Sequence, residues 1–140
     1  DMQDIIINYW AVLVAGVASM VVGFLWYSQA LFGKAWMEAS GLTKEKLDEA
    51  KRKGMGKTYF VSTILSFVTA YVLAHFMVLL SVTTTGGALQ LAFWIWLGFM
   101  MPIIAGDVLY GGRTMKLFWV NALYQLVSFL VMGIILALWR

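Results

Sequence analysis

The chain has 140 residues, of which 62% are hydrophobic and 12% are charged, and its formal net charge is +3 at pH 7. Soluble domains contain about 45–50% apolar and about 25% charged residues, so this composition excludes an ordinary soluble fold of this size. Cysteine is absent, which excludes disulfides, thiol nucleophiles and thiolate metal sites. We attribute the positive charge to the orientation of the chain in the membrane and to contact with lipid, and we expect no nucleic-acid partner.

Four apolar stretches account for most of the chain, and they cover residues 5–27, 59–80, 88–109 and 117–139. Together they contain one acidic residue, Asp107, and one histidine, His75. Each has about the 20 residues that a helix rising 1.5 Å per residue needs to cross about 30 Å of hydrocarbon. The sequence therefore predicts an all-α polytopic membrane protein, a single domain over residues 1–140 with four transmembrane helices in a compact bundle.

The first stretch is not expected to be a cleaved signal peptide. The upstream residues Asp1 and Asp4 are acidic where a signal peptide carries positive charge, and the apolar run is too long. We therefore interpret it as the first membrane span.

The connection over residues 28–58 divides into two parts. Residues 29–40 mix apolar and charged side chains, which is typical of an amphipathic segment in the membrane interface, and Gly41 is expected to end it. A short helix is then predicted over about residues 43–53, with Thr43 as its N-cap and Gly54 just past its last turn. Two interpretations of its basic end stay open: contact with anionic lipid headgroups, or a loop that only follows the positive-inside rule. The residues concerned are Lys51, Arg52 and Lys53.

The distribution of Lys and Arg among the connections predicts the orientation. Residues 28–58 contain most of them, residues 81–87 contain none, and residues 110–116 contain Arg113 and Lys116. Because short cytoplasmic loops are enriched in Lys and Arg, the first and third connections are expected in the cytoplasm and both termini outside.

Small residues recur four apart in two stretches, and residues at this spacing share one helix face. Lipid offers no hydrophobic drive for helix association, so close approach along small residues supplies the packing energy. We expect both faces to be buried against protein. The first consists of Ala11, Ala15, Ser19 and Gly23, and the second of Ser62, Ser66, Ala70 and Ala74.

The third stretch contains Pro102, which removes one backbone donor and frees the carbonyl of Gly98. Gly106 and Asp107 follow. A broken helix beside an acid is how transporters build ion sites. Asp107 also lies near the predicted cytoplasmic end, where Arg113 or a neighbouring lysine can pair with it. Structural pairing is the favoured interpretation, and Asp107 is the one candidate for a functional carboxylate.

The fourth stretch aligns Asn121 and Gln125 on one face, with Ser128 nearby. These side chains either line a polar cavity or form interhelical hydrogen bonds worth about 0.6 kcal/mol each, and the second interpretation is favoured. His75 lacks a second ligand nearby, so no metal site is expected. A hydrogen bond within the bundle is favoured over proton relay for this histidine.

Six blocks of the sequence form a pattern: residues 8–10, 25–28, 32–37, 55–57, 97–99 with Pro102, and 112–113 with Lys116. This pattern resembles a family of small bacterial membrane proteins known as domain of unknown function 1761. The resemblance covers the whole chain and implies four spans and a prokaryotic plasma membrane, with no activity, substrate or catalytic residue. Where the family pattern has proline, this chain has Gln29, so the end of the first helix is less firmly determined.

Two functions stay open, and the first is favoured because it has named candidate residues. One is a homo-oligomeric channel or carrier for an ion or small solute, suggested by residues 102–107 and by the face of Asn121 and Gln125. The other is a non-catalytic scaffold, lipid-binding or accessory protein with membrane lipids as its partners, suggested by the basic, amphipathic connection and by the lack of any deep charge. No nucleophile–base set, phosphate loop, metal-ligand cluster or cofactor motif is found, so no enzyme activity, metal or cofactor is expected. Small multidrug transporters rely on a glutamate within the membrane, whereas every glutamate here lies in the first connection.

Overall fold

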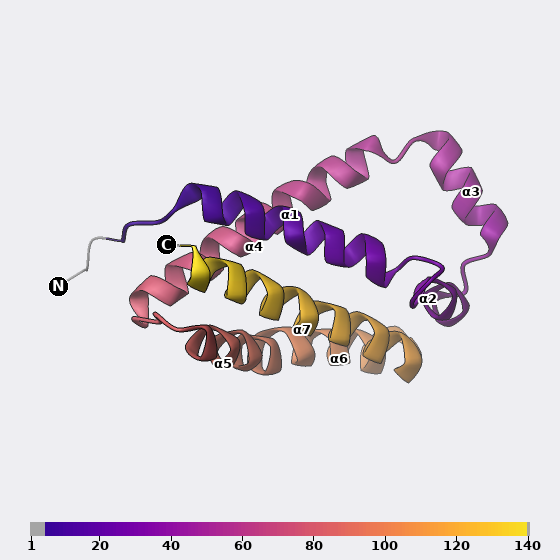
Figure 1. The fold of residues 1–140 in the computed structure, drawn as a ribbon. Coiled ribbons are helices and arrows are strands. Elements are labelled where there is room, and N and C mark those ends of the chain that lie inside the picture. Colours follow the sequence, from indigo (N-terminus) through magenta and orange to yellow (C-terminus); the bar gives the residue numbers. More distant parts are fainter. Residues whose placement is uncertain (1–4, 140) are drawn as a thin grey trace.

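The computed structural model describes residues 5–139, and this part of the chain forms helices without any strand (Figure 1). Asp1 and Asp4, the acidic residues upstream of the first apolar stretch, lie outside the described residues. In chain order the elements are α1 (Tyr9–Trp26), α2 (Gly33–Ser40), α3 (Lys44–Lys53), α4 (Gly56–Leu79), α5 (Thr85–Ile95), the π-helical turn η1 (Trp96–Met100), α6 (Met101–Gly111) and α7 (Met115–Leu138).

Four helical segments in the described part of the chain are long and apolar enough to cross a membrane. They are Tyr9–Trp26, Gly56–Leu79, Thr85–Gly111 and Met115–Leu138. The predicted all-α fold with four candidate spans is thereby confirmed. The first helix begins at Tyr9 rather than at residue 5, because the Asn8 side chain caps it and accepts from the backbone N–H groups of Trp10 and Ala11.

The first connection contains the predicted short helix, α3, and a second helix, α2, within the segment that was expected to be amphipathic. Gly41 ends α2 in the left-handed conformation (φ 73°), which a residue without a Cβ adopts at no steric cost. The Oγ1 atom of Thr43 then accepts a 3.2 Å hydrogen bond from the backbone N–H of Lys46 and caps α3. Gly54 follows the last turn of α3, as expected.

The four spans pack in a row rather than in a closed ring. Helix α1 lies between α4 and α7, and α7 in turn packs against α5, whereas α4 and α7 have little contact. Figure 1 shows α7 beside α1, with α5 and α6 along the other side of α7. The connections with α2 and α3 and with residues 112–114 lie at one end of the row, called the basic end. Residues 5–8, the turn over residues 80–84 and Trp139 lie at the other, called the terminal end.

Small side chains allow α1 to approach both of its neighbours. Ala11, Ala15 and Ser19 of the first small-residue face are buried, and Gly23 is half-buried against Tyr124 of α7. A Cβ atom on Gly16, which the predicted face did not include, would overlap the ring of Phe67 of α4. Both contacts therefore depend on residues that bring the helix backbones close together.

The second small-residue face is buried along only half of its length. Ala70 and Ala74 are buried, whereas Ser62 and Ser66 are half-buried. Figure 1 shows why, because α4 crosses α1 and moves away from it toward the basic end. The expectation that this whole face is buried is therefore wrong at its basic end, where space is left between α1 and α4.

Candidate functional site

A line of polar contacts joins α1 to α7, and we call it the polar seam. The phenol of Tyr27 donates a 2.7 Å hydrogen bond to the Oδ1 atom of Asn121. Deeper in the row, the hydroxyls of Ser19 and Ser128 lie 2.7 Å apart, and both residues are buried. Gln125 lies on the same face of α7 between these two contacts and is half-buried.

The polar groups of the seam are largely satisfied by one another. In residues 5–139, no buried side-chain nitrogen or oxygen atom lacks a hydrogen-bond partner. Direct contacts at 2.7 Å leave no room for water between the paired atoms. Asn121 and Ser128 therefore each form an interhelical hydrogen bond, Asn121 with Tyr27 and Ser128 with Ser19. Their partners, Tyr27 and Ser19, were not predicted. In the sequence, Tyr27 has the position of an aromatic residue at the headgroup level, and Ser19 belongs to a face of small residues that pack between helices.

Two tryptophan indole N–H groups also form hydrogen bonds to α7, in this case to its backbone. Trp26 donates to the backbone oxygen of Val120 at 2.9 Å, and the buried Trp96 donates to that of Ala122 at 2.7 Å. Both acceptors lie within helix α7, where the carbonyl already accepts a helical bond and offers its second lone pair. These contacts fix the rotation of α7 against α1 and the third span.

The predicted break at Pro102 takes a milder form than expected. The third span is helical over Thr85–Gly111, with a π-helical turn at Trp96–Met100 directly before the proline. Pro102 cannot donate to the carbonyl of Gly98, and the chain widens locally so that the N–H of Met101 bonds to the oxygen of Trp96. The regular α-helix is therefore interrupted by one π-helical turn that contains Gly98 and ends just before Pro102, while the span as a whole stays helical over Thr85–Gly111 and Gly106 lies in the regular helix α6.

Asp107 pairs with a cation of the third connection. Its Oδ2 atom lies 3.1 Å from Nε of Arg113, and the two side chains are 63% and 52% exposed. An ion pair this exposed contributes little to stability, about 0–1 kcal/mol. Asp107 therefore pairs with Arg113, whereas the hydrogen bonds of the polar seam join α1 to α7. A second ion pair, between Lys116 and Glu38 at 3.2 Å, ties α2 to the start of α7 and was not predicted.

His75 bonds within its own helix. Its Nδ1 atom lies 3.1 Å from the backbone oxygen of Tyr71, and its ring packs edge-on against the Tyr71 ring. No group of three or more His, Cys, Asp or Glu residues that could hold a metal ion occurs in the part of the chain that the structure describes.

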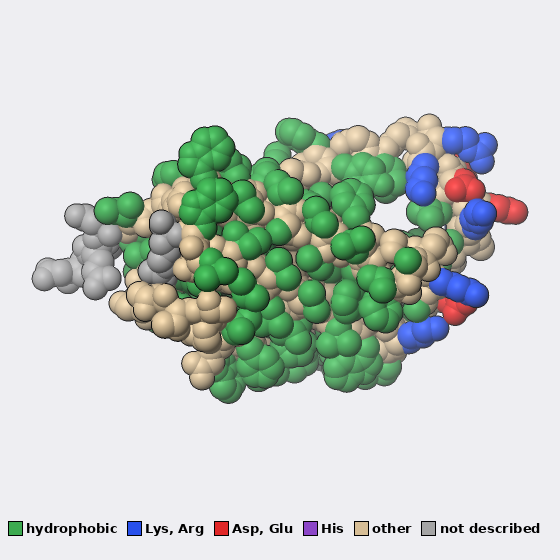
Figure 2. Space-filling model, viewed as in Figure 1, with side chains coloured by type: hydrophobic (Ala, Val, Ile, Leu, Met, Phe, Trp, Pro, Cys, Tyr) green, Lys and Arg blue, Asp and Glu red, His purple; other side chains and the backbone are tan. Residues whose placement is uncertain are grey.

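The space between α1 and α4 at the basic end forms a cavity of about 620 Å³, which we call the basic-end groove. Figure 2 shows the molecule hollowed there, with an opening next to the cluster of Lys and Arg side chains. Helices α1, α2, α3, α4 and α7 all contribute to it. Its lining consists of Met20, Gly23, Phe24, Tyr27, Trp36, Leu47, Lys51, Thr58, Tyr59, Ser62 and Tyr124.

The lining of the basic-end groove combines one cation, several hydroxyl groups and apolar surface. Lys51 is the charged member, and no acidic side chain occurs among the described residues that line it. Aromatic contacts hold the inner wall, since Tyr27 lies edge-on against Trp36 and Tyr124 at ring-centre distances of 5.8 and 5.2 Å. Of the predicted headgroup residues Lys51, Arg52 and Lys53, only Lys51 lines the groove, and Lys53 pairs with Glu49 at 3.1 Å.

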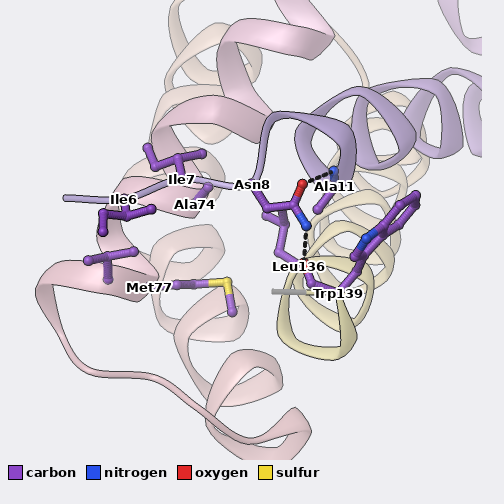
Figure 3. A pocket seen from close by; sticks show the side chains of 9 residues that line it. Ile6, Ile7, Asn8, Ala11, Ala74, Met77, Leu136 and Trp139 are labelled. Carbon is purple, nitrogen blue, oxygen red and sulfur yellow. Dashed lines mark hydrogen bonds between the residues drawn. The ribbon is translucent and has the colours of Figure 1, made fainter.

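A second cavity, of about 570 Å³, lies at the terminal end (Figure 3). Its walls are mainly apolar, with Met77 of α4 and Leu136 of α7 on opposite sides. The amide of Asn8 is its polar group, but that side chain already caps α1 and donates to the backbone oxygen of Trp139 at 3.4 Å. None of the described residues that line this cavity is charged, whereas Lys51 lines the basic-end groove.

Four candidate membrane-spanning helices, neutral hydrogen bonds between them and ion pairs at one end are features typical of small polytopic α-helical membrane proteins. The family described as "Protein of unknown function (DUF1761)" has a model that matches residues 10–137, and the chain belongs to this family. No curated protein and no solved structure matches the chain.

A double-mutant cycle on Ser19 and Ser128 measures what the buried contact contributes. We expect Ser19→Ala, Ser128→Ala and the double variant to give a coupling free energy of about 0.6 kcal/mol, because each single change leaves the other buried hydroxyl without its partner. The free energy of unfolding in mixed detergent micelles provides the measurement. A coupling of zero would mean that the two hydroxyls do not bond and would contradict the packing role of the seam.

Proposed function

We propose that the protein is a non-catalytic lipid-binding or accessory protein of a prokaryotic plasma membrane, with its basic end in the cytoplasm and both termini outside. The observation that carries this proposal is the gathering of Lys and Arg side chains at one end of four apolar helices, next to an open groove (Figure 2). The orientation is supported by the positive-inside rule, since the turn at residues 80–84 has no Lys or Arg.

Helix α3 is suited to the anionic headgroups of the cytoplasmic leaflet. It has five basic and three acidic residues, and the basic ones in its last turn are Lys51, Arg52 and Lys53. It buries no residue against the rest of the protein, so its charged side chains stay available. Each Lys or Arg near an anionic surface contributes about 1 kcal/mol of attraction.

Removal of the basic turn tests this proposal. We expect the wild-type protein, extracted in mild detergent, to retain more anionic phospholipid than the membrane it came from, and Lys51→Gln/Arg52→Gln/Lys53→Gln to lose that enrichment. Mass spectrometry of the extracted lipids measures it. Lys34→Gln/Lys44→Gln/Lys46→Gln removes the same charge from α2 and from the first turn of α3, and it should lose less of the enrichment than the change in the last turn does. An unchanged lipid composition in the first triple variant would contradict lipid binding at the end of α3.

Transport of an ion or small solute by a homo-oligomer is the second candidate function. The observation in its favour is the half-buried Gln125, which lies in the polar seam between two hydrogen-bonded contacts. The direct contacts on either side leave a single subunit without an open path along the seam, so a pathway would have to form between subunits or in another state.

Ion flux separates this candidate from lipid binding. If the protein is a carrier, potassium or proton flux into proteoliposomes should exceed that of protein-free vesicles and be lost in Gln125→Leu or Asp107→Asn. Gln90→Leu and Asp48→Asn are matched controls, because both residues are exposed and lie outside the seam. Flux equal to that of empty vesicles would remove this candidate.

A further inference from the structure

We infer that the basic-end groove binds one anionic phospholipid, with its phosphate at Lys51 and the first part of an acyl chain between α1 and α4. The inference rests on the proposed function and assigns it a defined site. It differs from general attraction to a charged surface, because the lipid here occupies a cavity and binds with fixed stoichiometry.

The volume and position of the groove fit such a ligand. About 620 Å³ lies within the range of about 300–1,000 Å³ found for small-molecule sites. Along α1 the lining extends from Tyr27 at the helix end inward to Met20, a depth of roughly 10 Å at 1.5 Å per residue. The groove therefore spans the level at which a phospholipid changes from headgroup to hydrocarbon.

The side chains that line the groove also change from charged and polar at its mouth to apolar deeper in. Lys51 comes from α3, beyond the ends of the spans, and supplies the cation at the mouth. The hydroxyl groups of Thr58 and Tyr59, in the first turn of α4, come next and suit phosphate or ester oxygens. Met20 and Phe24 are apolar and lie deeper along α1. No acidic side chain among the described lining residues opposes an anion.

Helix α3 supplies independent support for an occupant. It contains no buried residue and packs closely against no other helix, yet Leu47 and Lys51 both line the groove. Leu47 is half-buried on a helix that is otherwise exposed and polar. An acyl chain or glycerol backbone in the groove would cover the part of the Leu47 side chain that stays exposed.

Native mass spectrometry of the full-length protein in mild detergent tests the site, with phosphatidylglycerol and phosphatidylcholine as probes. We expect one phosphatidylglycerol to bind more tightly than phosphatidylcholine. Lys51→Gln should weaken phosphatidylglycerol about fivefold, the effect of one cation near a phosphate, and leave phosphatidylcholine unchanged. Ser62→Leu should weaken both lipids, because the larger side chain fills the groove.

Two matched controls keep the result specific. Lys53→Gln removes the same charge from α3 at a residue outside the lining, and Thr63→Leu enlarges a neighbouring residue that does not line the groove. Both should bind as the wild type does. Equal weakening by Lys51→Gln and Lys53→Gln, with wild-type binding by Ser62→Leu, would overturn the groove but leave the proposed function standing. No preference for phosphatidylglycerol in the wild type would overturn both.

Discussion

Charge cannot be left in hydrocarbon without a partner, and this constraint organises the whole structure. In the described part of the chain the three ion pairs all lie in or next to the connections of the basic end. Between the spans the side-chain contacts are neutral: serine to serine, tyrosine to asparagine, and indole to backbone carbonyl. Each satisfies a polar group that lipid could not, at a much smaller cost than a buried charge would bring. Polar chemistry at the basic end and neutral packing along the spans are thus two results of the same cause.

The row of spans explains why a groove exists at all. Helix α1 has close neighbours on two sides, and small residues let both approach: Gly23 admits Tyr124 of α7, and Gly16 admits Phe67 of α4. The contact with α7 continues along the polar seam to Tyr27 at the basic end. The contact with α4 becomes looser toward the basic end, where Phe24 and Tyr59 still meet at a ring-centre distance of 6.1 Å. The space that remains is lined by the hydroxyl groups of the first turns of α4 and by Lys51. Helix α4 buries its small residues along only half of its length, and the space left along the other half is the candidate site.

The sequence is sufficient for those features that depend on neighbouring residues. The four apolar lengths, the Thr43 cap and the stops at Gly41 and Gly54 are local, and the structure has them as expected. Features that depend on how distant helices cross could not be predicted in this way. The pairing of Tyr27 with Asn121 joins residues 94 apart, and that of Lys116 with Glu38 joins residues 78 apart. The basic-end groove depends on the course of α4, and Ser62 and Ser66 have the same sequence signal as the buried Ala70 and Ala74. Pro102 was recognised correctly as a disturbance, but a neighbouring π turn absorbs it instead of breaking the helix.

The most direct test of the account is the side of the membrane on which each connection lies. The chain has no cysteine, so single cysteines at Lys46 in α3 and at Thr83 in the turn between α4 and α5, both exposed, can be labelled with a membrane-impermeant maleimide. The account predicts that Thr83→Cys is labelled in intact spheroplasts and that Lys46→Cys is labelled only after the membrane is permeabilised. Labelling of Lys46→Cys in intact spheroplasts would contradict it, because the basic end would then lie on the outside, away from the anionic cytoplasmic leaflet.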